Sequence, residues 1–542
     1  METVSLIDVL LGEQGDLTAV ERFAQFHEGV AEPLQGRYYS ALLPARPPGP
    51  GQQLAFEVDL DRCSGCKACV AACHALNGLD EGEAWRDVGL IVGGAPGLPI
   101  LQHVTSTCHH CLEPACLNAC PVDAYEKDPV TGIVKHLDDQ CFGCQYCTLA
   151  CPYDAPKFHP GKGIVRKCDM CGDRLRAGEA PACVQACPHE AIRIRVVDRA
   201  AVRADAEAGE FLPAAPEPGY TRPTTRYRSS RPIEGPVRPA DHFRSAPEPA
   251  HWPLVLMLVL TQLSVGGFLM DLIARLAGGR GSAPLAGLSL GFGLLGLVAS
   301  TCHLGRPLYA YRALIGLRHS WLSREVAALG LFAKLAIAHV GLAVLMPSWS
   351  GAHPALRLAL ATAVVVAGLA GVACSVMVYH VVRRPFWRAS IGGVKFAGTV
   401  LVLGLATALV ASAWSTASSG AEGPGIERGL GLGLMVAFAA KLGFEASLLR
   451  HLKDRRITPL RRSAHLVRWA LKSPALQRLM LGAAGGIAVP TMLLAAGPSI
   501  DPAVRAAFAT LALVALLGGE VAERYLFFAA VVRPKMPGGL LP

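Results

Sequence analysis

The residues most able to do chemistry in this chain are its cysteines, which begin with the stretch CSGCKACVAAC at residues 63–73. Sixteen of the 18 cysteines lie between Cys63 and Cys187, and only Cys302 and Cys374 lie outside. Thiolates at this density serve as metal ligands or form disulfides. They fall into four groups of four: Cys63, Cys66, Cys69, Cys73; Cys108, Cys111, Cys116, Cys120; Cys141, Cys144, Cys147, Cys151; and Cys168, Cys171, Cys183, Cys187.

The spacing within the groups points to iron–sulfur clusters. Groups one and three read C-x2-C-x2-C-x3-C, the spacing of bacterial ferredoxins, in which three thiolates hold one cluster and the fourth ligates its neighbour. Groups two and four lengthen one gap, which a loop can absorb. Structural zinc would use two separated pairs and give the third cysteine no role, and a disulfide framework would need a small secreted chain. The pattern therefore predicts four [4Fe–4S] clusters.

The elements that must position these cysteines belong to a chain of uneven composition. Its 542 residues are too many for one core, and 17% charged against 52% hydrophobic residues indicates a membrane protein. From Trp252 onward the sequence shows eight apolar segments, each about the ~20 residues that a helix needs to cross a bilayer. They are residues 252–274, 284–301, 325–346, 358–381, 391–414, 429–448, 479–497 and 506–528.

We expect four parts: a leader (1–55), a four-cluster domain (56–200), a proline-rich connector (201–250) that is extended and builds no core, and a transmembrane anchor (251–542). The leader does not read as a secretory signal; it predicts a short amphipathic helix that docks on a partner or caps its own domain. The segments AFEVDLDRC and GIVKHLDDQC predict short strands before cysteine groups. The fold class is multidomain, an α+β ferredoxin-like tandem [4Fe–4S] domain followed by an all-α bundle of eight transmembrane helices.

Two parts of the chain resemble subunits of one enzyme family. The cysteine-rich part resembles the four-cluster subunit of the molybdopterin oxidoreductases of the dimethyl sulfoxide reductase superfamily, through CSGCKACVAACHALNG, CHHCLEPACLNACPVDA, CFGCQYCTLACPYDAP and KCDMCGDRLRAGEAPACVQACP. The apolar part resembles the eight-helix, quinol-oxidising anchor subunit of the same enzymes, through CHLGRPLYAYRAL (302–314), SWLSREV (320–326) and ERYLFF (523–528). In most relatives these are separate chains.

The resemblance implies a crossed ligation of the cysteines, outer group with outer and inner with inner. We name the four implied ligand sets as follows: set A is Cys63, Cys66, Cys69 and Cys187; set B is Cys73, Cys168, Cys171 and Cys183; set C is Cys108, Cys111, Cys116 and Cys151; set D is Cys120, Cys141, Cys144 and Cys147.

The anchor resemblance also implies a quinone site with His303 and Glu325. Both residues sit at one membrane face, at the ends of neighbouring spans. A quinol releases two protons as its electrons leave, so a histidine and a carboxylate suit the reaction. Arg306, Trp321 and Arg324 are neighbours that could shape the pocket. The alternative is that these polar residues only mark helix ends in the head-group layer.

Other polar residues of the spans have plainer explanations. Lys334, Lys441, Glu445, Glu520 and Arg524 fall within or near spans, and internal pairs such as Lys441 with Glu445 are favoured over a proton path. Haem is not expected, because His339 and His380 lie at different depths, although His303 with His380 stays open as an axial pair. Cys302 and Cys374 are expected to be packing residues.

Charge distribution predicts the orientation in the membrane. The net charge of +9 does not indicate nucleic-acid binding, because the basic residues cluster between apolar segments. The loops 302–325, 382–391 and 449–478 and the tail, all on one side, are much richer in Lys and Arg than the opposite loops. This places the iron–sulfur domain in the cytoplasm of a multi-pass inner-membrane protein, in contrast to the best-known sulfoxide-reducing relatives. The loop 449–478 could instead bind the soluble domain or a partner.

The sequence thus predicts a subunit that links the quinone pool to a separate molybdopterin catalytic chain, as in anaerobic respiration. The substrate chemistry is expected on that other chain, and the direction of electron flow stays open. Two alternatives remain: an ion-coupled membrane module driven by the clusters, and a cytoplasm-facing sulfite-oxidising complex that passes electrons to quinone.

Overall fold

The computed structural model describes residues 36–542 apart from 96, 232, 234, 279–280, 420–423, 497–499 and 540–542, together with residues 6, 7, 9, 12 and 25. Apart from those last five positions, the docking helix expected in the leader lies outside the described residues. Contacts divide the chain into two compact units. Unit 1 is Met1–Glu113, Lys127–Lys135 and Cys168–Arg238, and unit 2 is Pro114–Glu126, His136–Lys167 and Pro239–Pro542.

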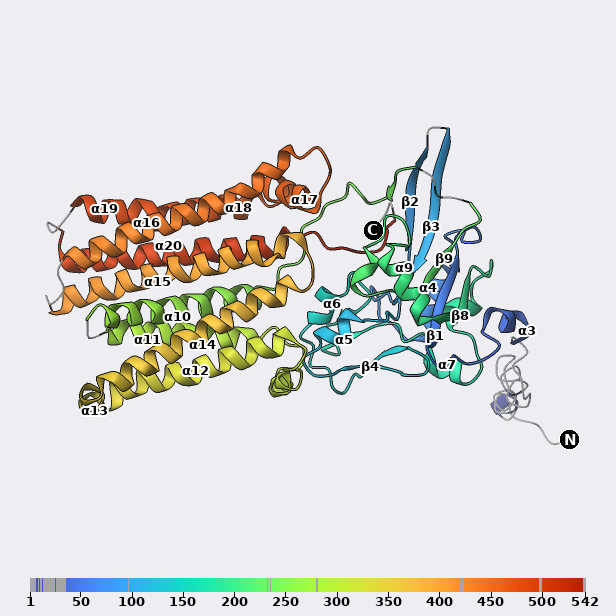
Figure 1. Ribbon diagram of the computed structural model, residues 1–542, viewed down its shortest axis with the longest axis horizontal. Helices are drawn as coiled ribbons and strands as arrows, with labels where there is room; N and C mark the ends of the chain where they lie inside the picture. The colour runs from blue at the N-terminus through green and yellow to red at the C-terminus, as the bar shows by residue number, and fades with distance from the viewer. Residues whose placement is uncertain are drawn as a thin grey trace. The chain divides into compact units, whose positions relative to one another are not determined.

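Unit 1 is built on two small sheets (Figure 1). In the first, β1 (Gln52–Asp59) lies between β8 (Ile192–Asp198), antiparallel, and β9 (Arg226–Arg228), parallel. Side chains on both faces of β1 are buried, as is typical of a strand with a nearly continuous run of apolar residues, here within QLAFEV. The second sheet is the hairpin of β2 (Asp87–Ala95) and β3 (Leu98–Ser106), extended by β10 (Val237–Pro239).

Short helices follow the cysteine loops in both units, and their starts repeat one backbone pattern. In groups one and three, the residues on both sides of the second cysteine are left-handed: Gly65 and Lys67 have φ of 76° and 61°, and Gly143 and Gln145 have 74° and 60°. Left-handed residues on both sides of the second cysteine turn the backbone sharply, so that the loop curves around its cysteines. The helices are α4 (Ala68–Leu76), α5 (Ala115–Ala119), α6 (Tyr146–Ala150), α7 (Gly172–Arg176) and α8 (Ala182–Gln185).

A second repeat follows each Cys-Pro pair. Asp123, Asp154 and Glu190 each stand three residues after a group's last cysteine, and all are left-handed, with φ of 52°, 57° and 51°. The turn lets the next amide reach back to sulfur: the Ala124 and Ala191 N–H groups donate to Cys120 Sγ at 3.2 Å and to Cys187 Sγ at 3.3 Å. The expected strands before the cysteine groups are confirmed as β1 and β5 (Val134–His136), which pairs with β4 (Tyr125–Lys127).

The predicted connector is more structured than its composition indicates. Residues 199–207 form α9 (Arg199–Glu207), and β9 joins the sheet beside β1. Leu212 and Thr221 are buried. The expectation that this segment builds no core is therefore wrong for its first part, because the residues between its prolines keep amides that can pair with a sheet edge.

Unit 2 contains the apolar helices, and among its described residues eight are long and apolar enough to cross a membrane, as predicted (Figure 1). They are α10 (Trp252–Leu276), α11 (Ala283–Thr301), α12 (Trp321–Leu345), α14 (Pro354–His380), α15 (Ala389–Ser419), α16 (Pro424–Ala446), the stretch from α18 (Lys472–Ala483) through the π-helical turn η7 (Ala484–Ala488) to α19 (Val489–Ala496), and α20 (Pro502–Ala529). Short elements fill their connections: η3 (Pro307–Leu314), α13 (Pro347–Ala352), η4 (Pro385–Trp387), η5 (Ser447–Lys453), α17 (Pro459–His465) and η6 (Leu466–Ala470).

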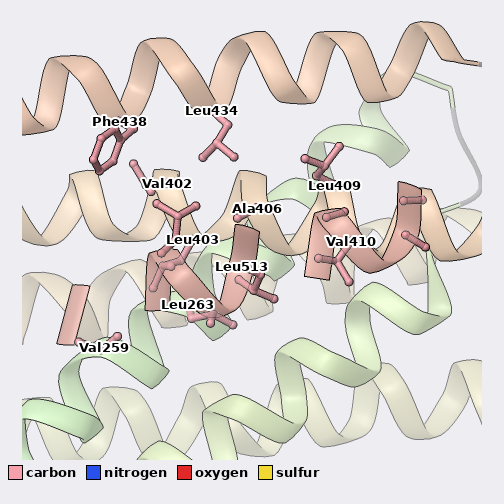
Figure 2. Close-up of a cluster of buried hydrophobic side chains, with 14 residues drawn as sticks. Val259, Leu263, Val402, Leu403, Ala406, Leu409, Val410, Leu434, Phe438 and Leu513 are labelled. Atoms are coloured by element: carbon pink, nitrogen blue, oxygen red, sulfur yellow. The ribbon is translucent and has the colours of Figure 1, made fainter. Parts of the chain in front are cut away.

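The bundle is centred on α15, which packs against α10, α16 and α20. Figure 2 shows side chains of these four helices meeting in one apolar cluster, with Phe438 and Leu434 of α16 facing Val402 and Leu403 of α15. The backbones of α10 and α15 touch where glycine meets glycine: a Cβ on Gly266 would lie 2.1 Å from the Val400 carbonyl oxygen, and one on Gly404 would lie 2.6 Å from Gly266. Small residues at such crossings let membrane helices pack closely.

Unit 2 also includes part of the cysteine region. The strands β6 (Lys157–His159) and β7 (Ile164–Arg166) form an antiparallel pair, and α5 and α6 belong to the same unit as the membrane helices. We call residues 114–126 and 136–167 the cysteine lobe of unit 2. The contacts that attach this lobe to the membrane helices determine which of its residues line the cavity described below.

Candidate functional site

Set A comes together within unit 1. Its four cysteines line one small cavity, with the neighbouring Arg62, Lys67 and His189. Cys66 is exposed and Cys63 is partly exposed, whereas Cys69 is buried and lies 3.5 Å from the Thr105 hydroxyl. A ligand held here would therefore be covered by the protein on one side and close to solvent on the other.

Set B is also gathered within unit 1 and is more deeply buried. Burial, followed by the neighbouring Cys183, raises the pKa of the Cys73 thiol to about 12. Burial raises the pKa of Cys168 too, with Cys73 and Cys183 among the neighbours that add to the shift. The Asn77 amide donates to Cys73 Sγ at 3.6 Å, and the Met170 N–H donates to Cys168 Sγ at 3.3 Å. Buried thiolates near one another repel unless a cationic centre joins them.

Set D is gathered within the cysteine lobe of unit 2. Burial raises the pKa of the Cys120 thiol to about 11, and Cys141 adds to the shift. Burial raises the pKa of Cys144 and Cys147 as well, and each feels the charges of Cys120 and Cys141. Cysteines that the resemblance groups into sets A, B and D thus lie near one another within a unit, and the ligand assignment of these sets stays a prediction. Set C draws Cys108 and Cys111 from unit 1 and Cys116 and Cys151 from unit 2, and it stays a prediction.

The donor sets fit iron–sulfur clusters. Within the part of the chain that is described, no three His, Cys, Asp or Glu side chains converge where one metal ion could sit. The sulfurs of set A instead surround a shared space, which suits a cluster that binds one thiolate per iron atom. Backbone amides that donate to Cys120 and Cys187 supply the hydrogen bonds that such clusters use.

The connection between α11 and α12, residues 302–320, fastens the cysteine lobe to the membrane helices, and we call it the strap. The Gly305 N–H donates to the Gly143 carbonyl at 3.3 Å, and the Gly316 N–H donates to the Pro121 carbonyl at 2.9 Å. Gly305 is in backbone contact with Gly163, since a Cβ on Gly305 would lie 2.2 Å from the Gly163 oxygen.

Side chains add to this attachment. Ser320 Oγ donates to the Ala119 carbonyl at 2.8 Å, and Tyr146 of α6 donates through its hydroxyl to the Val378 carbonyl of α14 at 2.8 Å. Arg533 of the tail bonds Asp154 at 2.8 Å. The set D loops are therefore held at the ends of α12 and α14 by bonds from several segments.

Directly beneath the lobe lies a cavity of about 300 Å³, in the size range of small-molecule sites. It is lined mainly by apolar side chains of α10, α11, α12 and α14, and its polar wall includes His251, His303 and Glu325. Residues of the cysteine lobe complete it, and Cys144 of set D is one of them. The other lobe residues at the wall are Phe142, Gln145, Tyr146 and Leu149.

His303 connects the cavity with set D. Its imidazole hydrogen-bonds the backbone of Cys144, and its ring meets the ring of His251 edge-on with centroids 4.9 Å apart. Burial, followed by the neighbouring His251, lowers the pKa of His303 to about 4. Glu325, in the first turns of α12, is 4% exposed and accepts a hydrogen bond from the Ser375 hydroxyl of α14. Both sequence-predicted residues thus reach one cavity.

The other three predicted pocket residues do not line this cavity. Arg306 belongs to the strap and donates to the Asp138 carbonyl at 3.0 Å and to the Cys141 carbonyl at 3.4 Å. Arg324 lies over the Trp321 ring, 4.5 Å from its centroid, and donates to the Leu317 carbonyl. Arg306 therefore holds the set D loop. Arg324 packs on Trp321 and ties the first turn of α12 to the chain that precedes it.

Sequence reasoning missed His251 and Tyr146, although both line the cavity. His251 precedes the first apolar helix, within PEPAHWP, and Tyr146 follows Cys144 within the cysteine run. A histidine beside a span's first residue is a signal that could have been found, whereas nothing in the sequence places Tyr146 against the bundle.

The remaining polar residues of the spans behave largely as expected. Lys441 pairs with Glu445 at 3.0 Å, as predicted, and also with Glu520. Arg478 joins the same two carboxylates, and Arg524 donates to Gln262 at 3.0 Å. Lys334 lies on the outer face of α12. His339 lies 3.4 Å from Asp271, and His380 accepts a hydrogen bond from the Ala389 N–H.

Two protein-family models match the chain. A model described as a 4Fe-4S dicluster domain matches residues 100–197, and one described as the anchor subunit of dimethyl sulfoxide reductase matches residues 249–421. The second match covers α10 to α15 and therefore includes the strap and the cavity.

Three curated proteins illustrate what the cysteine-rich half is similar to. The thiosulfate reductase electron transfer subunit PhsB of Salmonella typhi is 36% identical, over 27% of this chain and 77% of its own length. The B subunit of the anaerobic dimethyl sulfoxide reductase of Escherichia coli K12 is 34% identical, over 32% of this chain and 86% of its own length. The hydrogenase-2 operon protein HybA of Escherichia coli O157:H7 is 33% identical, over 27% of this chain and 52% of its own length.

Proposed function

Because this chain belongs to the family of iron–sulfur electron-transfer subunits of dimethyl sulfoxide and thiosulfate reductase complexes, fused to the membrane anchor of such complexes, we propose that it relays electrons between quinone and a molybdopterin-containing catalytic subunit. The proposed carriers are four [4Fe–4S] clusters held by sets A, B, C and D. Such clusters supply one-electron transfer, and the chain's own residues decide where electrons and protons enter.

The observation that carries this proposal is the shared wall of the cavity. Cys144 of set D and the proton-accepting candidates His303 and Glu325 line the same space of about 300 Å³. A mainly apolar cavity among membrane helices suits the ring of a lipid-soluble quinone. Set D is therefore the set that we assign to electron exchange with quinone.

The polar residues of the cavity suit the protons of the reaction. A quinol ring in the cavity would meet the imidazoles of His251 and His303 and the Glu325 carboxylate. His303, held by the Cys144 backbone and by His251, would accept a hydrogen bond from one hydroxyl, and Glu325 would take a proton from the quinol. Ser375 orients the Glu325 carboxylate through its hydrogen bond.

The opposite end of the relay is assigned to set A. Cys66 is exposed, and the rim of the set A cavity carries Arg62 and Lys67. An exposed cluster with a basic rim suits electron exchange with another protein, which we take to be the catalytic subunit. The basic loops on the side of the bundle where α10 begins favour a cytoplasmic position for this part of the chain.

The test is the rate of quinol-dependent cluster reduction in Glu325→Gln. General acid–base catalysis contributes roughly 10²- to 10⁴-fold, so we expect the rate to fall by about 10²-fold or more, with unchanged iron content and unchanged reduction by dithionite. Ser375→Ala, which removes only the partner hydroxyl, should slow the reaction less.

Glu427→Gln is the matched control, because Glu427 is also a buried carboxylate within a membrane helix but pairs with Arg505 and does not line the cavity. We expect its rate to match that of the unchanged protein. Equal rates for Glu325→Gln and the unchanged protein would remove Glu325 from the proposed site.

A further inference from the structure

Arg86, which precedes β2, is a cation buried within the cysteine region of unit 1. Its side chain is 2% exposed. The guanidinium lies over the Phe56 ring, 4.8 Å from its centroid, and donates to the Thr105 hydroxyl at 3.0 Å. That hydroxyl in turn lies 3.5 Å from Cys69 Sγ. Arg86 is therefore fixed on one side by a protein core and on the other by a short bridge to set A.

The groups that act most strongly on this cation are cysteine sulfurs of two sets. They are Cys183, Cys168 and Cys73 of set B and Cys69 of set A. Arg86 also hydrogen-bonds Cys183 directly. One buried charge thus serves two neighbouring ligand sets.

Arg86 has no carboxylate counter-ion among the residues that the structure describes. Its NH2 nitrogen is buried without a hydrogen-bond partner among them, which is costly for a charged group. A buried guanidinium without a carboxylate partner needs other anions nearby, and the neighbouring cysteine thiolates are such anions.

Such a charge bears directly on electron affinity. The potential of an iron–sulfur cluster depends on its net charge, on hydrogen bonds to its sulfurs and on its exposure. Each reduction adds one negative charge to a cluster, and a fixed cation in a low-dielectric interior stabilises that added charge.

We propose that Arg86 is a positioning residue that raises the reduction potentials of the clusters held by set B and set A. The proposal rests on the ligand sets assigned above. With Arg86 present, an electron on either cluster is stabilised by the same guanidinium.

The test is a redox titration of the full chain followed by electron paramagnetic resonance, which reports each cluster separately. In Arg86→Gln we expect the midpoint potential of the set B cluster to fall by at least the equivalent of a tenfold change in its reduction equilibrium, about 59 mV for one electron. The set A cluster should shift in the same direction by less. Arg86→Lys, which keeps the charge, should retain most of the original potential.

Arg62→Gln is the matched control. Arg62 also lies beside set A, but it is about half exposed and pairs with Asp59 and Glu190, so solvent and carboxylates screen its charge. We expect the potential to shift less than half as much as in Arg86→Gln.

Iron content separates this proposal from the assignment of the ligand sets. Unchanged potentials in an Arg86→Gln protein that keeps its iron would overturn the proposal and leave the sets intact. Loss of cluster from both Arg86→Gln and Arg86→Met, with normal binding in Arg86→Lys, would make the arginine a structural brace and would also overturn it. A missing set A or set B signal in the unchanged protein would instead contradict the ligand sets themselves.

Discussion

At the scale of single residues, His303 and Glu325 form part of the polar wall of the cavity, whereas Arg306 holds a loop. His303 and Glu325 stand out because ionisable groups near span ends are rare and costly. Arg306 stands out for the same reason, yet its guanidinium is used on carbonyl oxygens of the set D loop. Side-chain type predicts that a group needs a partner, but only the folded chain decides whether that partner is a carbonyl or a ligand.

Cys120→Ser tests the assignment of set D. We expect the protein to lose one cluster, about four iron atoms, because Cys120 is one of the four thiolates assigned to set D and supplies the ligand from group two. Quinol should then no longer reduce the remaining clusters, whereas dithionite still should. Iron analysis and stopped-flow absorbance would measure both. Cys302→Ser, an exposed cysteine outside the four groups, should behave like the unchanged protein.

At the scale of elements, hydropathy predicts the eight spans because each must satisfy one simple condition of length and composition. The same condition says nothing about connections. Arg306 of the strap was expected to shape a quinone pocket, and in the structure it holds the set D loop instead. The strap backbone holds the cysteine lobe as well, through Gly305 and Gly316. Glycines within CHLGRP and ALIGLR give no periodic signal, so a close approach of two loops at Gly305 could not be predicted from the sequence.

Gly305→Ala tests this close approach. A Cβ at this position would overlap the Gly163 carbonyl, so the lobe must shift away from α12. A displacement of about 1 Å can cost on the order of 10²-fold in rate, and we expect a loss of that order in quinol-dependent reduction, with sets A and B still reducible by dithionite. Gly287→Ala, in α11 with open space around it, is the control. Equal rates for both variants would contradict the role given to the strap.

Lys441→Met tests the buried charges between α16, α18 and α20. It leaves Glu520 and Glu445 without one of their cations, and breaking a buried pair costs roughly 3–5 kcal/mol. Thermal unfolding in detergent should show this loss, and adding Glu520→Gln should restore part of it. Lys334→Met, on the outer face of α12, should change stability little. A small loss in both would mean that the network contributes little to folding.

At the scale of the whole molecule, the sequence predicted the fusion of a cluster domain with an anchor, and the comparisons support it. The predicted part boundaries at residues 55, 200 and 250 stay predictions. The boundaries of the two compact units differ from the predicted ones. The cysteine lobe lies within the predicted cluster domain in sequence but belongs to unit 2. Composition changes at residue 250, but contacts made by backbone atoms leave no mark in composition.

Iron removal tests how unit 1 is held together. Set A joins residues near β1 to Cys187, just before β8, and set B joins α4 to α8. Without clusters these cross-links between segments are lost. The free energy of metal binding contributes to the free energy of folding, so unit 1 should lose stability. We expect limited proteolysis of chelator-treated protein to cut within residues 52–238, while residues 252–529 stay protected in detergent. Resistance of the treated protein throughout would show that the sheet of β1, β8 and β9 suffices.

The strap has a practical consequence for anyone who divides this polypeptide. A chain that stops at residue 250 keeps all sixteen clustered cysteines but lacks the partners of the Gly143 and Pro121 carbonyls and of the Tyr146 hydroxyl. Such a truncation should be poorly soluble and prone to self-association on gel filtration. Recombinant work on the soluble half will therefore do better to retain residues 251–380 as well, to the end of α14 and with detergent, than to cut at the prolines.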